Sequence, residues 1–580
     1  MRASVPRALL IYPEFPPSYW GFRYALELLG KRSSMPPLGL LTVAAMFPGS
    51  WELRLVDLNV EALDDSDLGW ADLVLTSTMV VQQRSLREVL ARCNALGKPV
   101  VVGGPYPTSF ATEIAGADHF LLGEVEEIFP RFLADWEAGR AAREYRPSSK
   151  PAITATPVPR FELLDLSAYG SMAIQFSRGC PFDCEFCDIK KLFGRVPRTK
   201  TNEQMLAELD ALRSLGWRGA LFLVDDNFIG NRREAMRLLP AIAAWQRQHG
   251  SPFDLYTEAS MNLARSEPLM DAMVEAGFSM VFVGIESPNP EALRRTNKPQ
   301  NAARGEDVFL LHAVRTIQAK GLEVTAGFIL GLDGDGPEVF DAQVDFIQRA
   351  GIPIAMVGLL TALRGTDLYS RLEREGRLLE ESSGNNVGFA LNFVSELDRI
   401  VLIDGYRKVL ASLYGPDLRT YFARCRTLLA GMGHGPRRRQ GPSRAEILAL
   451  IRSLRLQLFS RQGPAYAAFL AHTLFTRPMV LGMAIRLAIK GWHLQRFTAQ
   501  MLGADAFRAT AMEGYENAER LLERAASASE RLRWKTERQV IRTIRRLRRR
   551  YRRLRPEFRQ GLLPDRRAIE SALRALVREV

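Results

Sequence analysis

Three of the five cysteines in this 580-residue chain lie within eight residues, at Cys180, Cys184 and Cys187. Three residues separate the first pair and two separate the second. Thiolates are preferred ligands of iron-sulfur clusters and of zinc, and three of them leave one metal position without a protein ligand. The spacing therefore predicts a metal centre with an open coordination position.

Two other interpretations of these cysteines fit the sequence less well. Five cysteines in 580 residues, with no secretory signal ahead of them, are typical of a cytosolic protein, which disfavours a disulfide. A structural zinc ion would need a fourth ligand nearby, but the nearest histidines, His119 and His249, are about 60 residues away. The remaining Cys93 and Cys425 lie in apolar, helix-like segments, and we expect both to be buried thiols.

The cysteine segment resembles the signature of radical S-adenosylmethionine (SAM) enzymes, in which an aromatic residue, here Phe186, precedes the third cysteine. In that family three thiolates hold a 4Fe-4S cluster, and the amino and carboxylate groups of SAM bind the fourth iron. An electron from the cluster cleaves SAM to methionine and a 5′-deoxyadenosyl radical, which takes hydrogen from the substrate. The resemblance implies that Cys180, Cys184 and Cys187 bind such a cluster.

The first 145 residues alternate short apolar runs with helix-length segments, which predicts a doubly wound, Rossmann-like parallel sheet. Such sheets bind ligands beyond the carboxyl ends of their strands, and glycines there allow the backbone to approach a large ligand closely. On pattern alone, a nucleotide or a flavin fits as well as any other large cofactor. The runs are 8–12, 53–57, 73–77, 100–104 and 119–123, and they end at Pro13, Asp57, Ser77 and Gly103-Gly104.

The ends of these runs resemble the cobalamin-binding domain of a large group of radical SAM enzymes. In place of the histidine that ligates cobalt in cobalamin mutases, the chain has Asn59. We therefore expect cobalamin bound without a histidine lower ligand, and an empty, vestigial domain is the alternative. The resemblance rests on Tyr12-Pro13, 36–40, 56–59, Ser77, 103–105 and Gly123-Glu124, and it implies that Asp57, Asn59, Ser77, Gly103 and Gly104 bind cobalamin.

A segment rich in Pro, Ser and Thr, 146–170, is predicted to link the first domain to a second. From 171 to 378 strands and helices alternate again, which predicts a partial (β/α), TIM-like barrel. Its first strand, 173–176, leads into the cysteines at its carboxyl end, where the chemistry of such barrels takes place. The further runs are 221–227, 255–258, 280–286, 324–331 and 356–361.

Polar residues and glycines at the ends of these strands match positions that contact SAM in the family, although strands also end in polar residues for purely structural reasons. Carboxylates suit such contacts because they accept hydrogen bonds from ammonium and hydroxyl groups. Arg195 and Arg198 follow the cysteines and either meet the SAM carboxylate or are solvated loop charges. The resemblance places Asp225, Asp226 and Asn227 at the methionine amine, Glu258 and Ser260 near the ribose or carboxylate, Glu286 near the ribose hydroxyls and Gly327 beside the adenine.

Helical patterns fill the rest of the chain, with predicted regions at 379–505 and 506–580. The apolar segments 465–475 and 485–492 indicate either a helical core or a cover for an apolar substrate or membrane face. Residues 531–560 hold 14 basic residues against two glutamates, which accounts for nearly all of the net charge of +13.

The basic segment is predicted to be a helix that ends or kinks near Pro556. Its apolar residues recur at steps of three and four, so we expect the helix to lie on an anionic membrane surface. RNA binding, or simple packing on neighbouring helices, are the alternatives. The stripe consists of Ile541, Ile544, Leu547, Tyr551 and Leu554.

The complete pattern resembles the cobalamin-dependent, class B radical SAM methyltransferases. Over most of the first ~500 residues it is most similar to the hopanoid C-2 methylase group, with cues at 11–16, 224–231 and 488–493. The resemblance implies methyl transfer to an unactivated carbon, with a polycyclic lipid as the expected substrate. It also implies a 4Fe-4S cluster, SAM and cobalamin as cofactors, and flavodoxin or ferredoxin as the electron donor.

Two alternatives belong to other functional classes. The first is a cobalamin-dependent radical SAM cyclase or rearranging enzyme that transfers no methyl group. The second is a non-catalytic cobalamin or SAM sensor with a nucleic-acid-binding tail, which the intact cysteines disfavour. No apolar run reaches the roughly 18 to 20 residues of a membrane span, so we expect a cytoplasmic protein, either free or on the cytoplasmic face of a membrane.

Overall fold

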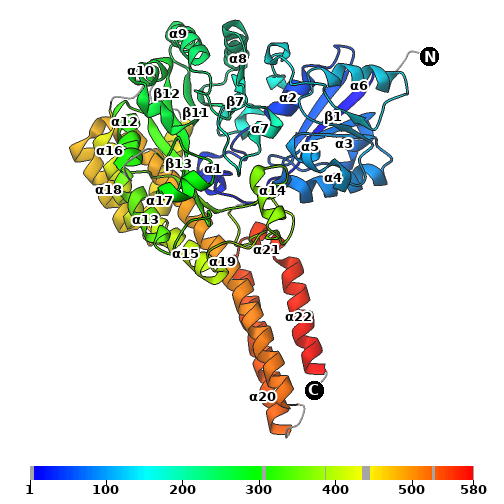
Figure 1. Cartoon of the computed structure of the whole chain (residues 1–580), viewed down its shortest axis with the longest axis vertical. Coiled ribbons are helices and arrows are strands. Elements are labelled where there is room, and N and C mark those ends of the chain that lie inside the picture. The colour runs from blue at the N-terminus through cyan, green and yellow to red at the C-terminus, as the bar shows by residue number, and fades with distance from the viewer. Residues whose placement is uncertain (1–4, 303–307, 386, 434–443, 526–529, 579–580) are drawn as a thin grey trace. The chain divides into compact units, whose positions relative to one another are not determined.

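The structure, a computed structural model, describes residues 5–302, 308–385, 387–433, 444–525 and 530–578 (Figure 1). The chain divides into two units. Unit 1 comprises Met1–Phe15 and Trp20–Trp492, and unit 2 comprises Pro16–Tyr19 and His493–Val580. The finer domain boundaries expected from the sequence, near 145, 170, 378 and 505, stay predictions.

Six parallel strands form the first sheet of unit 1, in the order β2-β1-β3-β4-β5-β6. Five of them coincide with the apolar runs of the sequence, and the sixth, with two residues, is too short to produce a pattern. The strands are β1 (Arg7–Tyr12), β2 (Glu52–Asp57), β3 (Leu73–Ser77), β4 (Val100–Gly103), β5 (His119–Leu121) and β6 (Glu144–Tyr145). The helices around them are α1 (Arg23–Leu29), α2 (Leu38–Ala44), α3 (Asp65–Trp70), α4 (Gln83–Ala95), α5 (Pro105–Phe110) and α6 (Ile128–Glu137).

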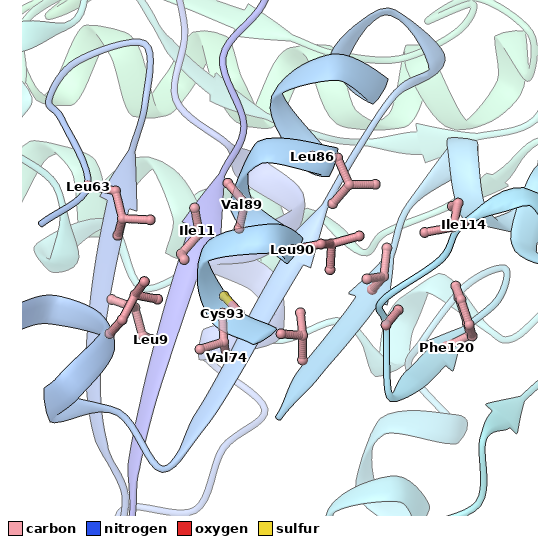
Figure 2. Packing of buried hydrophobic residues seen from close by; sticks show 14 of the residues in the cluster. Leu9, Ile11, Leu63, Val74, Leu86, Val89, Leu90, Cys93, Ile114 and Phe120 are labelled. Atoms are coloured by element: carbon pink, nitrogen blue, oxygen red, sulfur yellow. The ribbon is translucent and has the colours of Figure 1, made fainter. Parts of the chain in front are cut away.

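Helices cover both faces of this sheet, because successive residues of each strand point to opposite faces and both faces are apolar. Leu9 and Ile11 of β1 pack in the cluster that includes α4, where Cys93 is fully buried as predicted (Figure 2). The intervening Ala8 and Leu10 pack in the clusters of α6 and α2 on the other face. The predicted doubly wound sheet is confirmed.

The connecting segment 146–170 folds closely onto its surroundings, although it contains three short 3-10 turns and little else that is regular. Ile153, Phe161 and Tyr169 are buried. The Tyr169 hydroxyl donates a hydrogen bond to Asp57 Oδ2 at 2.9 Å. The segment is therefore part of the packed structure of unit 1 and not a loose tether.

A second parallel sheet follows, in the order β14-β13-β12-β11-β10-β7, and confirms all six predicted strands of the partial barrel. Alternate residues of its central strands, such as Leu221, Leu255 and Val281, are fully buried against helices. The strands are β7 (Met172–Ile174), β10 (Gly219–Leu223), β11 (Phe253–Ala259), β12 (Phe278–Glu286), β13 (Glu323–Leu330) and β14 (Ala355–Leu359). The helices are α8 (Asn202–Ser214), α9 (Arg232–Gln248), α10 (Glu267–Ala276), α11 (Pro290–Arg295), α12 (Val308–Ala319), α13 (Val339–Ala350) and α14 (Asp367–Arg374).

Helices complete unit 1, as the sequence predicts. Cys425 is fully buried in α16. Lys490 of α19 contacts the first residue of β13, because its Nζ is 3.0 Å from Glu323 Oε1. Within the described ranges, no helix is both long and apolar enough to cross a membrane. These helices are α15 (Arg399–Leu413), α16 (Arg419–Gly431), α17 (Arg444–Leu458), α18 (Gly463–Thr476) and α19 (Leu481–Ala525), the last of which continues into unit 2.

Unit 2 contains the rest of α19 with α20 (Glu530–Arg553), α21 (Pro556–Gly561) and α22 (Leu563–Arg578). The basic helix ends before Pro556, as predicted. Its apolar stripe packs against the unit's own helices, because Leu547, Tyr551 and Leu554 are buried with Phe507 of α19 and Leu573 of α22. Most of the stripe is therefore buried inside the protein and is not available for insertion into a membrane.

Candidate cofactor site

The three cysteines lie in a loop that begins directly after the first barrel strand. Two short antiparallel strands, β8 (Ser177–Arg178) and β9 (Arg198–Thr199), close its base, and α7 (Ile189–Leu192) lies within it. Gly179 has a φ of 101°, and a Cβ there would lie 2.8 Å from the carbonyl oxygen of Gly194. Glycine is required at this position because the loop closes on itself there.

Amide side chains face two of the three sulfur atoms. Asn227 Nδ2 is 3.9 Å from Cys180 Sγ, and Gln300 Nε2 is 3.7 Å from Cys184 Sγ. Burial, together with the neighbouring Asp188, Cys184 and Cys180, raises the pKa of Cys187 to about 12. A bound metal deprotonates such thiols, and N–H donors to sulfur are a usual way to tune an iron-sulfur cluster.

The donor set fits a cluster better than a single ion. Among the described residues, no three Cys, His, Asp or Glu side chains converge on the position of a single ion. A 4Fe-4S cluster binds each thiolate at a different iron, so its cysteines need not converge on one point. Three free, partly buried cysteines on one loop satisfy that requirement.

Asp225, which the resemblance places at the SAM amine, is bonded to the segment that leads into the cysteines. The residue is 1% exposed. Its Oδ1 accepts a hydrogen bond from Phe176 N at 2.8 Å, and its Oδ2 accepts from Ser177 N and Oγ at 2.9 and 2.7 Å. These bonds hold the turn from β7 into the cysteine hairpin, so Asp225 positions the loop.

Asp226 and Glu258 are the predicted residues that best fit a cationic ligand. Burial and the charges of Asp226, Asp225 and Glu286 raise the pKa of Glu258 to about 8. Burial likewise raises the pKa of Asp226 to about 7, although Gly179 N donates to its Oδ2 at 3.1 Å. Within the described part of the chain no donor group is bonded to the Glu258 carboxylate. An ammonium or sulfonium group would relieve this repulsion between carboxylates.

The other predicted SAM residues lie around the same strand ends. Asn227 connects Cys180 to Ser260, whose N–H donates to Asn227 Oδ1 at 3.2 Å. Glu286, with a φ of 68°, forms a buried ion pair with Lys298. A Cβ at Gly327 would lie 3.2 Å from the ring of Phe282, so this glycine makes room for a side chain of the protein.

Ser77, one of the five cobalamin candidates, lines a pocket at the carboxyl ends of β1, β3 and β4. Thr78, directly after β3, is 1% exposed, and among the described residues its Oγ1 has no hydrogen-bond partner. A buried hydroxyl of this kind fits a bound ligand that carries amide groups, such as cobalamin. The pocket is lined by Tyr12, Pro37, Leu38, Gly39, Leu40, Ser77, Thr78, Met79, Gln82 and Pro105.

The two glycines of this edge support the protein's own packing. Gly103 pairs with Ser77 in the sheet, and its carbonyl oxygen accepts from Thr78 N at 3.0 Å. Gly104 has a φ of 100°, and a Cβ there would lie 2.7 Å from Ser77 Oγ. At Gly104 the backbone therefore lies close to Ser77 of the neighbouring strand. The sequence alone suggests a close approach to a ligand at this position.

Asp57 and Asn59 are bonded to each other and to the loop after β1. Asp57 is 1% exposed, and its Oδ1 accepts from Asn59 Nδ2 at 2.7 Å. Asn59 Oδ1 in turn accepts from Phe15 N at 2.9 Å. Through these contacts Asp57 positions Asn59 and Tyr169, and the ligand contact expected for it stays a prediction.

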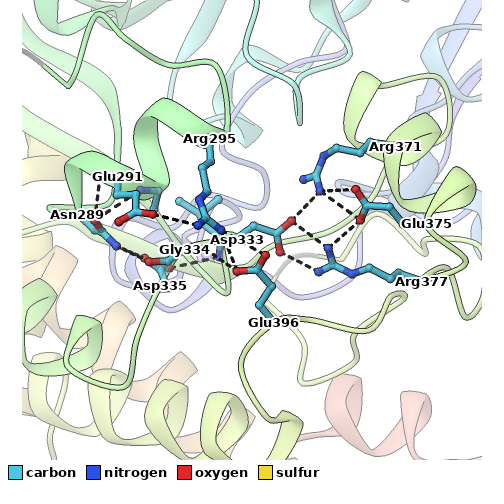
Figure 3. Close-up of polar contacts among 12 residues, drawn as sticks. Asn289, Glu291, Arg295, Asp333, Gly334, Asp335, Arg371, Glu375, Arg377 and Glu396 are labelled. Carbon is cyan, nitrogen blue, oxygen red and sulfur yellow. Dashed lines mark hydrogen bonds and ion pairs between the residues drawn. The ribbon is translucent and has the colours of Figure 1, made fainter.

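A network of charges holds the tip of the cysteine loop. The guanidinium of Arg371, in α14, binds Glu185 of the loop through Nη2–Oε1 and Nε–Oε2 distances of 2.8 and 3.1 Å. Its Nη1 also binds Asp333 Oδ2 at 2.7 Å. Figure 3 shows Asp333, just beyond β13, between Arg371 and Arg377. The loop is thereby tied to the carboxyl end of a distant barrel strand.

Both arginines of the loop pair with acidic side chains, and the exposed Arg195 matches the alternative of a solvated loop charge. Arg195 pairs with Asp183 at 3.3 Å and is exposed. Arg198 forms a paired contact with Glu124, at 2.8 Å between Nη2 and Oε1. Sequence reasoning missed Lys298, Gln300 and Arg371 as neighbours of the cysteines, because they lie more than one hundred residues away along the chain and no spacing pattern links them.

Three successive ranges of the chain match known protein families. Residues 32–133 match the B12 binding domain, 174–347 match the radical SAM superfamily, and 366–506 match a domain of unknown function. An uncharacterized methyltransferase of Synechocystis sp. is 46% identical over 413 residues, which are 71% of this chain and 76% of that protein. The hopanoid C-2 methylase of Rhodopseudomonas palustris is 37% identical over 417 residues, 71% of this chain and 77% of that one.

A solved structure has a similar fold. The radical SAM methyltransferase TsrM of Kitasatospora setae, with cobalamin and a 4Fe-4S cluster bound, superimposes with a TM-score of 0.52 at 16% identity. The similarity covers 84% of this chain and 98% of that one. At this identity the similarity concerns the arrangement of the sheets and helices.

Proposed function

Because this chain belongs to the cobalamin-binding methyltransferases of the radical SAM superfamily, we propose that it methylates an unactivated carbon of an apolar polycyclic lipid, a hopanoid. Its cofactors are a 4Fe-4S cluster, SAM and cobalamin. When bound, the cluster and SAM supply hydrogen abstraction, and cobalamin supplies a transferable methyl group. The protein's own residues bind and orient these groups and exclude water.

Each cofactor has proposed residues. Cys180, Cys184 and Cys187 hold the cluster. Asp226, Glu258 and Ser260 bind the cationic and ribose parts of SAM, with Glu286 and Gly327 beside them. Thr78 and Ser77, which line the pocket, face cobalamin, and Asn59 and Gly103, at the ends of neighbouring strands, are its further proposed contacts. Asp225, Asp57 and Gly104 shape these sites through the hydrogen bonds and close packing described above.

The aromatic lining of the barrel interior supports an apolar substrate. Along β10, β11 and β12, partly accessible residues alternate with buried ones. Phe222 and Tyr256 stack there with ring centroids 4.7 Å apart. Trp20 is 41% exposed, and the centroids of its ring and the ring of Phe282 are 4.8 Å apart. Flat aromatic surfaces of this kind suit a flat, apolar ring system.

The substrate proposal is tested by supplying a hopanoid in detergent micelles to the anaerobically reconstituted enzyme and measuring the methylated lipid by mass spectrometry. Trp20→Ala should raise the KM for the lipid about tenfold, whereas Trp534→Ala, at an exposed tryptophan of unit 2, should not change it. Methylation of no polycyclic lipid, by an enzyme that cleaves SAM, would contradict the proposal.

Two partners are proposed, an electron donor and an anionic lipid surface. The cluster needs a one-electron reductant, for which flavodoxin or ferredoxin is proposed.

For the basic helix we infer electrostatic contact with anionic lipid headgroups, because Arg542, Arg545 and Arg549 are exposed and the substrate is a membrane lipid. Binding to vesicles that contain an anionic phospholipid should be lost when these arginines are replaced by glutamine, and binding to RNA instead would contradict this inference.

A further inference from the structure

We propose that Glu124 is a positioning residue that fixes the cysteine hairpin against the cobalamin-binding domain, and so sets the separation of the cluster and cobalamin sites. Glu124 lies just after β5 in the first domain, whereas its partners, Arg178 and Arg198, are the two residues that pair at the base of the cysteine loop. The inference rests on the family's methyl transfer and is independent of the lipid proposed as substrate.

The contacts of Glu124 have the geometry of strong ion pairs. Arg198 donates from Nη2 to Oε1 at 2.8 Å and from Nη1 to Oε2 at 3.0 Å. Arg178 Nη1 donates to the same Oε2 at 2.9 Å and to Glu126 Oε1 at 2.6 Å. Two parallel N–H···O bonds fix the relative orientation of both groups as well as their distance.

The network is buried and balanced in charge. The side chains of Glu124 and Glu126 are each 2% exposed, and those of Arg178 and Arg198 are 12% and 19% exposed. Two carboxylates face two guanidinium groups. Thr156 Oγ1, in the connecting segment, donates to Glu126 Oε1 at 3.0 Å. Removal of one member would leave a buried charge without its partner, which is strongly unfavourable.

The position of the network gives it consequences beyond stability. Arg178 is separated from Cys180 only by Gly179, whose N–H is held by Asp226 of the barrel. The base of the cysteine loop is thus fixed on one side by the barrel and on the other by the cobalamin-binding domain. Since methyl transfer requires both cofactors to reach one substrate carbon, a small shift at this junction separates hydrogen abstraction from methyl delivery.

The test compares Glu124→Gln, which keeps the size of the side chain, with Glu275→Gln, which removes an exposed ion pair with Arg247. In cofactor-free protein, Glu124→Gln should increase hydrogen–deuterium exchange at 123–126, 177–179 and 198–199. In cluster- and cobalamin-loaded protein, it should change the magnetic coupling between the reduced cluster and Co(II) in electron paramagnetic resonance. Glu275→Gln should change neither signal.

Turnover supplies a third measurement. Glu124→Gln should lower the methylated product formed per 5′-deoxyadenosine about tenfold or more, and Arg198→Lys, which keeps the charge but loses the paired contact, should give an intermediate ratio. Unchanged exchange and unchanged magnetic coupling in Glu124→Gln would overturn the inference, whether or not the lipid is a substrate. If Glu124→Gln does not fold, Arg198→Lys decides by the same three measurements.

Discussion

Arg371 holds the carboxylate of Glu185, the residue between Cys184 and Phe186, through two hydrogen bonds of 2.8 and 3.1 Å. The same guanidinium contacts Asp333, which Arg377 also binds. The residue next to a cluster ligand is therefore fixed by an arginine nearly two hundred positions away. This relationship connects the order of the cysteine loop to the folding of α14.

Arg371→Ala should lower both stability and cluster loading. The substitution removes the arginine that binds Glu185 and one of the two arginines that bind Asp333, at a cost of about 1 to 3 kcal/mol, between values for exposed and buried pairs. Thermal unfolding of the cluster-free protein measures this cost, and iron per chain after reconstitution measures loading. Arg349→Ala, which removes an exposed helical pair with Asp345, is the control. Equal behaviour of the two variants would contradict a role for Arg371.

Replacement of Cys180, Cys184 or Cys187 by alanine should abolish the iron-sulfur absorbance, because each thiolate binds a different iron. Cys93→Ala is the matched control, since Cys93 lies in the core of the first sheet (Figure 2). The Cys93→Ala variant should keep full iron loading. Its free energy of unfolding should fall by about 1 kcal/mol, because alanine fills less of the core than cysteine. A stable cluster in any of the three loop variants would refute the assignment of that ligand.

Glu258→Gln should make the cofactor-free protein more stable at alkaline pH while weakening SAM binding. The pKa of Glu258 is raised from 4.5 to about 8 in the folded protein by burial and neighbouring carboxylates. Between pH 4.5 and 8 the folded state therefore binds more protons than the unfolded state, so the wild type loses stability as pH rises through this window. The free energy of unfolding of Glu258→Gln should exceed that of the wild type by about 1 to 3 kcal/mol at pH 9, and the two should be nearly equal at pH 4.

Thermal unfolding at several pH values measures the stability of Glu258→Gln, and equilibrium dialysis measures its SAM affinity, which should fall about tenfold or more. Glu275→Gln should alter neither quantity, because its side chain is exposed. A variant with unchanged SAM affinity, or one that is destabilised at alkaline pH, would contradict the role given to Glu258.

Thr78→Val should weaken cobalamin binding without destabilising the protein. Its buried hydroxyl has no partner among the described residues, so the methyl group of valine replaces a group that contributes nothing to folding without ligand. A lost hydrogen bond of about 1 kcal/mol predicts roughly fivefold weaker cobalamin binding by equilibrium dialysis. Thr473→Val, whose hydroxyl donates to Phe469 O within α18, is the control. Unaltered cobalamin affinity would exclude a contact at Thr78.

The sequence predicted the two parallel sheets well because each strand is a short apolar run that ends in glycine or a polar residue. It placed Asp226, Glu258 and Ser77 at strand ends, for the same reason. It failed where the outcome depends on packing between distant segments. Whether Asp225 and Asp57 face a ligand or bond to the backbone is decided by turns such as Phe176-Ser177, and periodicity carries no signal of this.

The basic helix illustrates the same limit. Its amphipathic pattern correctly predicted a helix that ends before Pro556. The pattern is identical for a helix that lies on a membrane and for one that packs on its neighbours. Only the burial of Leu547 and Tyr551 with Phe507 distinguishes these cases.

The most direct test of the central claim uses SAM with a deuterated methyl group, the anaerobically reconstituted enzyme, a reductant and a hopanoid. Methyl transfer with radical chemistry predicts S-adenosylhomocysteine and 5′-deoxyadenosine in equal amounts, and a lipid that carries the deuterated methyl group. Formation of 5′-deoxyadenosine without S-adenosylhomocysteine and without label in the lipid would contradict it.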